Sequence, residues 1–250
     1  MFISIAAFIA VFTIVVLVHE LGHFLAARRT GVKVYEFSIG FPFSPKIATL
    51  FRHRETEFTL RLLPLGGFVS FSRDGDEEAP EFFAIPRRDR AAILSAGPLL
   101  NIGFAIILFV LAFFFGKQLP VVDAVVLSVK TVGSVISGTV GFLISMLSGH
   151  ASWEGLSGPI GIAAIAGKAA AKGFMNLLHF TGMLSVSLGI MNLIPFPALD
   201  GGQLLMLLIE VVKRKPFSLK TYQVVNALGM ALFLVLTIMV TYKDIVKIIA

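Results

Sequence analysis

Two histidines and a glutamate lie close together near the start of the chain, as His19, Glu20 and His23. Residues four apart on a helix point the same way, one turn above the other, so the two imidazoles can bind one metal ion. Glu20 follows the first histidine directly, where its carboxylate can reach a metal-bound water without joining the ligands. His-Glu-x-x-His on a helix is typical of zinc sites in which zinc activates water and the glutamate acts as base. The spacing therefore predicts hydrolytic zinc chemistry.

These three residues lie inside an apolar run, Phe2 to Ala27, that is long enough to cross a membrane. An ionisable residue in such a span costs roughly 2.5–3.5 kcal/mol on insertion scales, and metal binding would compensate for all three. The alternative is that they only mark the end of the span, which Arg28 and Arg29 follow. One histidine fits that alternative, but two histidines with a glutamate exceed what a helix end needs.

A catalytic zinc usually takes three protein ligands, so the third must come from elsewhere in the chain. Cysteine is absent, which leaves His53, His150, His179 or a carboxylate. Asp200 lies in a second apolar span, in the sequence PALDGG, where two glycines allow close backbone approach. The three other histidines are expected to be solvated or capping residues. A helix N-cap role for Asp200 is the alternative, and it is compatible with a ligand role.

The composition is that of an integral membrane protein. Of the 250 residues, 56% are hydrophobic and 14% charged, with a mean hydropathy of +0.90, whereas soluble domains have about 45–50% apolar and about 25% charged residues. The first apolar run lacks the basic start and the cleavage site of a secretory signal, so we expect it in the mature protein. The net charge of +6 fits cytoplasmic loops and lipid headgroups, and nucleic acid is not expected as a partner.

The sequence predicts an α-helical membrane protein with about four transmembrane helices and both termini outside. Besides the first span, the runs Ala91 to Phe115 and Tyr222 to Tyr242 are long enough to cross. The run Phe180 to Val212 is too long for one straight span and is interrupted by NLIPFPALDGG. Prolines and paired glycines break helical geometry, and irregular backbone at membrane depth must be buried or line a cavity. The break therefore predicts an internal site.

The segment Val121 to Leu147 is apolar but contains Asp123 and Lys130, and we expect it to be an amphipathic or re-entrant segment on the external face. Eleven of the 21 Lys and Arg residues fall between Arg28 and Arg90, and four more follow the broken span. Both basic segments lie on one side only if this segment does not cross, which the positive-inside bias favours. A fifth span is the alternative.

Between the first two spans, two segments rich in β-branched and aromatic residues predict a membrane-associated β-hairpin or sheet. They are Val32 to Phe41 and Glu57 to Phe71. Large apolar side chains alternate over residues 37–43, so the sheet is expected to dip into the membrane, and a soluble hairpin is the alternative. The acidic stretch Ser72 to Glu81 is expected to be a solvated loop.

Five motifs occur in the order of one known family. They are His19-Glu20-Leu21-Gly22-His23-Phe24, LPLGGFV (63–69), AGPLLN (96–101), LSGPIGIA (156–163) and NLIPFPALDGG (192–202). In these motifs the chain resembles the site-2 protease family of intramembrane zinc metalloproteases, and the resemblance spans most of its length. The double match of the first and the last motif is highly specific.

The resemblance implies Zn²⁺ as the cofactor, with His19, His23 and Asp200 as its ligands and Glu20 as the catalytic carboxylate. It also implies that the Val34 to Phe71 region is a membrane-associated hairpin or sheet that pairs with an unwound substrate. The substrate-binding residues that it implies are Asn192, Pro195, Pro197, Gly67 and Phe68.

Two features depart from relatives of the bacterial envelope-stress type. Those relatives carry one or two PDZ domains between the second and third spans, whereas only Gly116 to Gly155 intervenes here. We therefore expect a single metalloprotease domain over 1–250, with a hairpin region at 34–72 and a short linker and interfacial helix at 117–155. A separate PDZ or regulatory protein would then supply any size filter. The second departure is SIGFPF, where the family often has Gly-Phe-Gly and where Pro42 removes a backbone donor.

Residues and resemblance together predict a zinc-dependent intramembrane endopeptidase of the bacterial inner membrane, with its active site towards the cytoplasmic side. It would cut transmembrane segments of membrane proteins, and anti-sigma factors and signal-peptide remnants are typical substrates of such relatives. The expected partners are a transmembrane substrate and the lipid bilayer. One alternative is a catalytically silent homologue that binds membrane helices, and another is a metal transporter. The intact Glu20 beside a single site argues against both.

Overall fold

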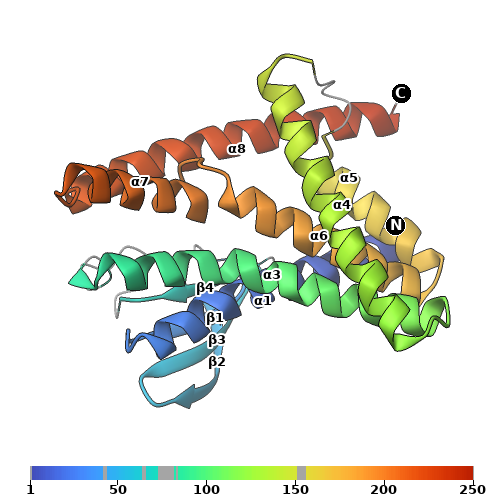
Figure 1. Cartoon of the computed structure of the whole chain (residues 1–250), viewed down its shortest axis with the longest axis horizontal. Coiled ribbons are helices and arrows are strands. Elements are labelled where there is room, and N and C mark those ends of the chain that lie inside the picture. Colours follow the sequence, from blue (N-terminus) through green and yellow to red (C-terminus); the bar gives the residue numbers. More distant parts are fainter. Residues whose placement is uncertain are drawn as a thin grey trace. The chain divides into compact units, whose positions relative to one another are not determined.

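The structure is a computed structural model that describes residues 2–41, 44–63, 66–72, 82, 84–150 and 156–249. Its helices and strands, labelled in Figure 1, are α1 (Phe2–Arg29), β1 (Glu36–Ile39), β2 (Lys46–His53), β3 (Thr56–Arg61), β4 (Gly67–Ser70), α3 (Arg87–Gly116), α4 (Val121–Leu147), α5 (Pro159–Ala171), α6 (Phe174–Leu193), α7 (Asp200–Lys213) and α8 (Leu219–Ile249). Pro42 and residues 73–81 of the expected acidic loop lie outside the described residues.

Within the described residues, five helices are long and apolar enough to cross a membrane, namely α1, α3, α4, α6 and α8. Only 6% of the most apolar window of α8 is buried inside the protein, and its Leu228 and Ile238 are each 67% exposed. Apolar surface on this scale is expected where lipid, and not water, surrounds the helix. The α-helical, multi-pass membrane protein predicted from the composition is thereby confirmed.

The segment Val121–Leu147 forms one unbroken helix of 27 residues, α4. It therefore has no re-entrant form, in which two short pieces would turn back on each other. The sequence predicts about four spans. Among the described residues, five helices, including α4, are long and apolar enough to cross a membrane.

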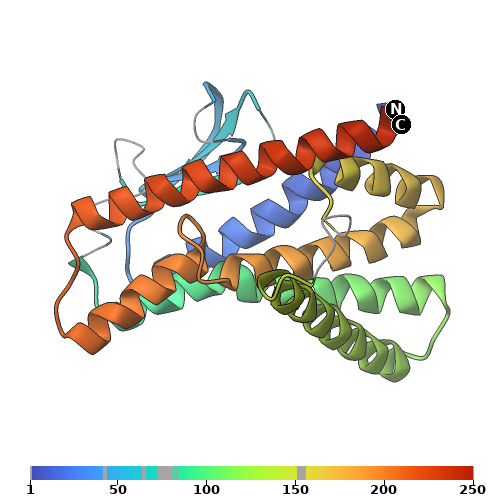
Figure 2. The same cartoon turned by 90° about the horizontal axis from the view of Figure 1, so that it is seen from above.

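The predicted break in the long apolar run near the C-terminus is confirmed. Helix α6 ends at Leu193 and α7 begins at Asp200, and the irregular segment 194–199 that joins them can be followed in Figure 2. This segment contains Pro195 and Pro197, which have no backbone N–H to continue a helix. The chain is thus irregular immediately before the acidic residue that the sequence singles out.

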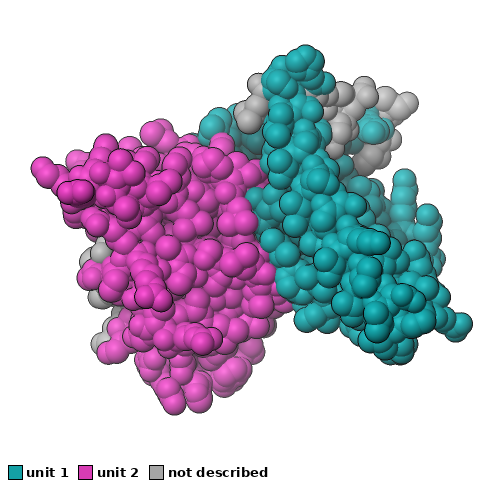
Figure 3. Space-filling view, viewed as in Figure 1, with its two compact units in different colours: residues 1–11, 102–190, 231–250 teal, residues 12–101, 191–230 magenta. Residues whose placement is uncertain are grey.

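The chain divides into two compact units, which are coloured separately in Figure 3. Unit 1 comprises residues 1–11, 102–190 and 231–250, and unit 2 comprises residues 12–101 and 191–230. In the core of unit 1, Phe109 of α3 packs with Ala124 of α4 and Val186 of α6. The α5 segment is tied to α8 because the backbone N–H of Gly161 donates to Oδ2 of Asp244 at 2.8 Å.

Unit 2 contains a four-stranded sheet with the strand order β2-β3-β1-β4. Strands β2 and β3 are antiparallel neighbours, β1 and β3 run parallel, and β4 pairs antiparallel with β1. The two segments predicted to form a hairpin are therefore not paired as one, because β1 and β3 share a direction. The hairpin is instead formed by β2 and β3. Strand β2 was not predicted, because it is largely exposed and its polar and apolar residues follow no clear alternation.

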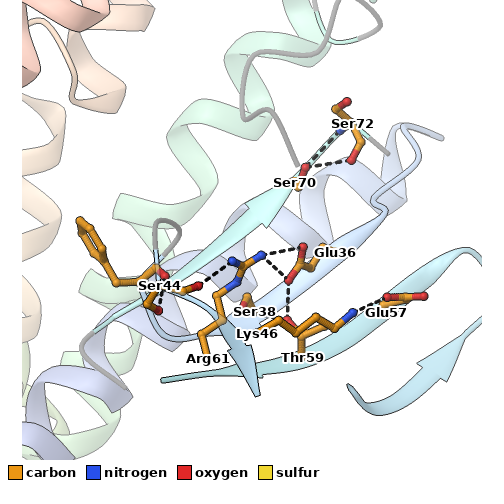
Figure 4. Close-up of polar contacts among 10 residues, drawn as sticks. Glu36, Ser38, Ser44, Lys46, Glu57, Thr59, Arg61, Ser70 and Ser72 are labelled. Atoms are coloured by element: carbon orange, nitrogen blue, oxygen red, sulfur yellow. Dashed lines mark hydrogen bonds and ion pairs between the residues drawn. The ribbon is translucent and has the colours of Figure 1, made fainter. Parts of the chain in front are cut away.

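A polar cluster fixes β3 against β1, as Figure 4 shows. Arg61 donates from Nη2 to Glu36 at 3.0 Å, and Thr59 donates to the same carboxylate at 2.6 Å. Both charged side chains are 15% exposed, so water screens them little. On the apolar side, Phe24 of α1 packs edge-on against Phe37 and Phe58. The sheet is thus packed directly onto the helix that carries the two histidines.

Candidate metal centre

The two histidines of α1 meet at their Nε2 atoms. His19 and His23 are 7% and 8% exposed, and their Nε2 atoms lie 3.1 Å apart. This follows from the four-residue spacing, which places both rings on one face of the helix. Two imidazole nitrogens therefore converge at one buried point.

The carboxylate of Asp200 reaches the same point from α7. Its Oδ2 lies 3.1 Å from Nε2 of His19 and 3.4 Å from Nε2 of His23, and the side chain is 14% exposed. Helix α7 begins at Asp200, its N-cap is Leu199, and no side chain caps it. The capping role considered for Asp200 is therefore wrong, and its carboxylate faces the histidines instead.

The glycines after Asp200 allow the irregular segment to fold back onto the first turn of α7. A Cβ at Gly201 would lie 2.3 Å from the carbonyl oxygens of Leu193 and Ile194, and a Cβ at Gly202 would lie 2.2 Å from that of Phe196. Any larger residue at either position would displace segment 194–199 from the first turn of α7. Ala198 supplies the turn into the helix with a φ of 75°, a left-handed conformation that non-glycine residues rarely adopt.

Helix α3 closes the other side of the histidine pair through its small residues. A Cβ at Gly97 would lie 2.4 Å from Nε2 of His23 and 3.0 Å from Cε1 of His19, and a Cβ at Gly22 would lie 2.4 Å from the carbonyl oxygen of Ala96. The backbones of α1 and α3 therefore touch at this level. The imidazoles pack against bare backbone, which leaves their Nε2 atoms facing Asp200.

Each histidine also has a partner at its second ring nitrogen. Nδ1 of His23 lies 2.8 Å from the carbonyl oxygen of Ile93, so Nδ1 carries the proton and donates it to this acceptor. Nδ1 of His19 lies 3.4 Å from the side-chain amide nitrogen of Asn101. A carbonyl acceptor at Nδ1 fixes the orientation of the His23 ring and leaves its Nε2 lone pair for a metal.

The donor set and its spacing fit zinc. Zinc binds histidine nitrogen and carboxylate oxygen at about 2.0–2.2 Å with tetrahedral angles, which places neighbouring ligand atoms roughly 3.3–3.6 Å apart. The three ligand atoms here are separated by 3.1, 3.1 and 3.4 Å, two of them slightly shorter than this spacing, so a small outward shift would accommodate the ion. Oδ2 of Asp200 is also buried without a well-aligned hydrogen-bond donor among the described residues. A cation would satisfy this oxygen, and three protein ligands leave a fourth position for water.

The other histidines considered as ligands lie elsewhere. His53 ends the exposed strand β2, and His150 is exposed after α4. His179 belongs to unit 1, where its ring packs against Phe109 and Phe113. Among the described residues, His19, His23 and Asp200 are the group of histidine and acidic side chains that can hold an ion.

A cavity of about 230 Å³ opens beside these three residues, and it lies entirely within unit 2. Glu20 lines it together with four of the residues predicted to bind substrate, namely Gly67, Phe68, Asn192 and Pro197. Pro195 is exposed and is not part of the lining. The edge strand β4, Glu20 and the α6–α7 break therefore all border one cavity beside the histidines.

Sequence reasoning gave no individual role to Gly22, Gly97 or Asn101. The motif AGPLLN contains the last two, and their spacing of four residues on α3 was a signal that they share a face. Tyr222 and Asn226 of α8 also line the cavity. No spacing rule in the sequence connects them to the histidines, because they come from a distant helix.

Fold and site together define a multi-pass membrane protein with a largely buried group of side chains that can hold a metal ion. Residues 7–236 match the model of Peptidase family M50. The chain belongs to this family, the site-2 proteases, and it is a zinc metalloprotease of the membrane.

Several similar proteins bear the name "Putative zinc metalloprotease". One from Clostridium acetobutylicum is 28% identical over 337 aligned residues, covering 98% of each chain. One from Clostridium perfringens is 29% identical, covering 94% of this chain and 96% of the relative. One from Staphylococcus aureus is 26% identical over 422 aligned residues, covering 97% and 98%. These alignments are longer than the 250 residues of this chain, so the relatives contain inserted residues that it lacks.

Proposed function

We propose that this metalloprotease hydrolyses peptide bonds within transmembrane segments of other membrane proteins. The observation that carries the proposal is that His19 and His23, on an apolar helix suited to crossing the membrane, converge with Asp200 of α7 at 3.1–3.4 Å. Ionisable groups at such a position are costly unless they are paired or bind an ion. A site that cuts there must receive a substrate from the bilayer.

In this proposal His19, His23 and Asp200 hold the zinc ion through Nε2, Nε2 and Oδ2. Bound zinc supplies a Lewis acid that polarises the scissile carbonyl and lowers the pKa of water towards about 7. The carbonyl oxygen of Ile93, at Nδ1, presents His23 as a neutral ligand, and the carboxylate of Asp200 offsets part of the ionic charge.

Glu20 is the proposed general base. Glu20 lines the same cavity as the three ligands, and a Cβ at Gly67 would lie 3.4 Å from its Cγ, so Glu20 lies beside β4. A carboxylate oxygen of Glu20 takes a proton from the attacking water and later delivers it to the leaving amine nitrogen. Water thereby adds across the peptide C–N bond, which breaks.

Strand β4 is the proposed docking edge for an extended substrate. It is the last strand in the order β2-β3-β1-β4, and Gly67, Phe68 and Val69 line the cavity. An extended peptide can add to such an edge by main-chain hydrogen bonds. A helical segment must unwind first, since its backbone groups are already paired. Asn192 and Pro197 contribute from the facing wall.

The proposed location is the inner membrane of a bacterium, with the site towards the cytoplasm. Helix α1 ends with Arg28 and Arg29, less than two turns after His23, and the basic residues Lys213, Arg214, Lys215 and Lys220 follow α7. Lys and Arg accumulate on the cytoplasmic side. With both basic segments on that side, we propose that α4 adds no net crossing and is the interfacial helix of a single domain over 1–250.

The test uses purified protein in liposomes and a model substrate, a single-span peptide of about 20 apolar residues with glycines at its centre. Wild-type protein is expected to bind one zinc and to cut the peptide, whereas Glu20→Gln should bind zinc and cut at less than about 1% of the rate. Glu57→Gln, a change at a partly exposed side chain on β3, is the matched control and should cut normally. Cleavage by Glu20→Gln at the wild-type rate would refute the assignment of the base. Bound zinc without cleavage would favour the silent homologue.

A further inference from the structure

Asn101 is an amide buried in an apolar helix. It lies on α3 with none of its surface exposed, and its amide nitrogen is 3.4 Å from Nδ1 of His19. A buried amide must be hydrogen-bonded to avoid a cost of roughly 1–3 kcal/mol. A buried asparagine in an apolar helix therefore indicates a specific polar partner. The polar group beside it is His19, a proposed zinc ligand.

The position of Asn101 on α3 relates it to both histidines. Gly97 lies four residues earlier, so the two side-chain positions share one face of the helix. Gly97 is the point at which the backbone of α3 touches both imidazoles. One turn further along, the same face presents an amide to the ring edge of His19. The backbone carbonyl of Ile93, one turn before Gly97, serves His23 in the same way at 2.8 Å.

If His19 binds a metal through Nε2, its Nδ1 requires a hydrogen-bond acceptor. When Nε2 gives its lone pair to a metal, the proton of the neutral ring is on Nδ1, which then needs an acceptor. The amide of Asn101 has an oxygen acceptor and a nitrogen donor that exchange places by a half turn of the side chain. A carboxamide can therefore present its Oδ1 to Nδ1–H, whereas an apolar side chain of the same size cannot.

We propose that Asn101 is a positioning residue that holds the His19 ring with Nε2 directed at the zinc ion, by accepting a hydrogen bond from Nδ1. This inference rests on the proposed role of His19 as a ligand. Asn101 is not among the residues that line the cavity, and in this proposal it acts on the metal site through His19. The pair His19–Asn101 then matches the pair His23–Ile93, one with a side-chain acceptor and one with a backbone acceptor.

The experiment compares zinc affinity, by competition with a chromophoric chelator, in detergent-solubilised wild-type protein, Asn101→Leu and Asn101→Asp. Loss of a partner of this kind typically weakens metal binding by about 10- to 100-fold, which is the expected result for Asn101→Leu. Asn101→Asp retains an acceptor and should restore the affinity to within about threefold of wild type, since the acceptor and not the amide nitrogen is required. The absorption bands of the Co²⁺-substituted protein should change in Asn101→Leu and return in Asn101→Asp.

The matched control is Thr181→Val in α6, which also removes a buried polar group. The Thr181 hydroxyl donates to the carbonyl of Leu177 in its own helix, so this change should leave zinc affinity and the Co²⁺ bands unaltered. If Asn101→Leu does not fold, Asn101→Ser takes its place, because the shorter hydroxyl does not reach His19.

Wild-type zinc affinity in Asn101→Leu, or failure of Asn101→Asp to restore it, would overturn the inference while leaving the proposed ligands intact. A wild-type protein that binds no zinc would instead overturn the proposed function and this inference with it. A lower melting temperature of metal-free Asn101→Leu with unchanged zinc affinity would show a merely structural role and also overturns it.

Discussion

Oδ2 of Asp200 lies 3.1 Å from Nε2 of His19, although one residue begins α7 and the other lies in the second half of α1. The irregular segment 194–199 and the glycines that follow Asp200 make this meeting sterically possible. If both groups bind the same metal ion, a change at either residue should weaken metal binding, and this can be measured directly.

Asp200→Asn is expected to lose zinc. The amide oxygen has no charge to offset that of the ion, so affinity should fall by more than the roughly 10- to 100-fold typical of losing a group that only supports a ligand. Zinc content after dialysis against a weak chelator, together with cleavage of the model peptide, checks this. Full zinc occupancy and normal cleavage in Asp200→Asn would exclude Asp200 as the third ligand.

Gly97→Ala should disrupt the site although it adds only a methyl group. The new carbon would lie 2.4 Å from Nε2 of His23, so the ring must move away from Asp200 and zinc affinity should fall at least about tenfold. Gly103→Ala on the same helix is the control, since nothing lies within 4 Å of a Cβ there, and it should bind zinc normally. Equal affinities in the two variants would mean that α3 does not press on the histidines.

Val69→Cys on β4 should form a disulfide with a cysteine placed near the scissile bond of the model peptide. The natural chain contains no cysteine, so each introduced thiol is the only one in the protein. Thr49→Cys on β2, the opposite edge of the sheet, is the control and should give little cross-link under the same oxidant. Gel mobility under non-reducing conditions gives the readout. Comparable cross-linking at both edges would refute a preference of the substrate for β4.

Arg90→Met should destabilise unit 2 strongly. Nη2 of Arg90 donates to Oε2 of Glu210 at 2.6 Å, and these residues are 4% and 1% exposed. Without Arg90, the buried carboxylate of Glu210 keeps only the more distant and more exposed Arg87 as an ion-pair partner among the described residues, at 3.5 Å, and breaking a buried ion pair costs up to about 3–5 kcal/mol. The thermal unfolding midpoint in detergent should fall accordingly, and adding Glu210→Gln to Arg90→Met should recover part of the loss.

The control for Arg90→Met is Lys46→Met. Its partner Glu57 is 2.8 Å away, but the two side chains are 39% and 36% exposed, and such pairs contribute about 0–1 kcal/mol. If Lys46→Met lowers the unfolding midpoint as much as Arg90→Met does, burial does not explain the contribution of the Arg90–Glu210 pair to stability.

The helices and the position of the site were predictable because their signals are local. A run of apolar residues sets a membrane helix, the spacing of His19 and His23 sets their common face, and prolines with glycines mark the break before Asp200. The residue types themselves limited the search for a third ligand, since cysteine is absent and few carboxylates lie in apolar segments.

The sheet and the support of the histidines were not predictable to the same depth, because they depend on contacts between distant segments. Nothing local shows that β1 pairs with β3 in parallel, since this requires β2 to pass to the far edge. In the same way, the sequence around Gly97 gives no sign that its missing side chain accommodates His23. Such roles emerge only when the two helices are placed side by side.

Unit 2 is assembled from an early stretch, residues 12–101, and a late stretch, residues 191–230. During synthesis the early stretch leaves the ribosome well before the late one. His19 and His23 therefore enter the membrane before Asp200 has been synthesised. Under the proposed ligand assignment, a nascent or prematurely terminated polypeptide cannot cut its neighbours during insertion. Under the same assignment, the order of the segments along the chain keeps the metal site incomplete until Asp200 has been synthesised.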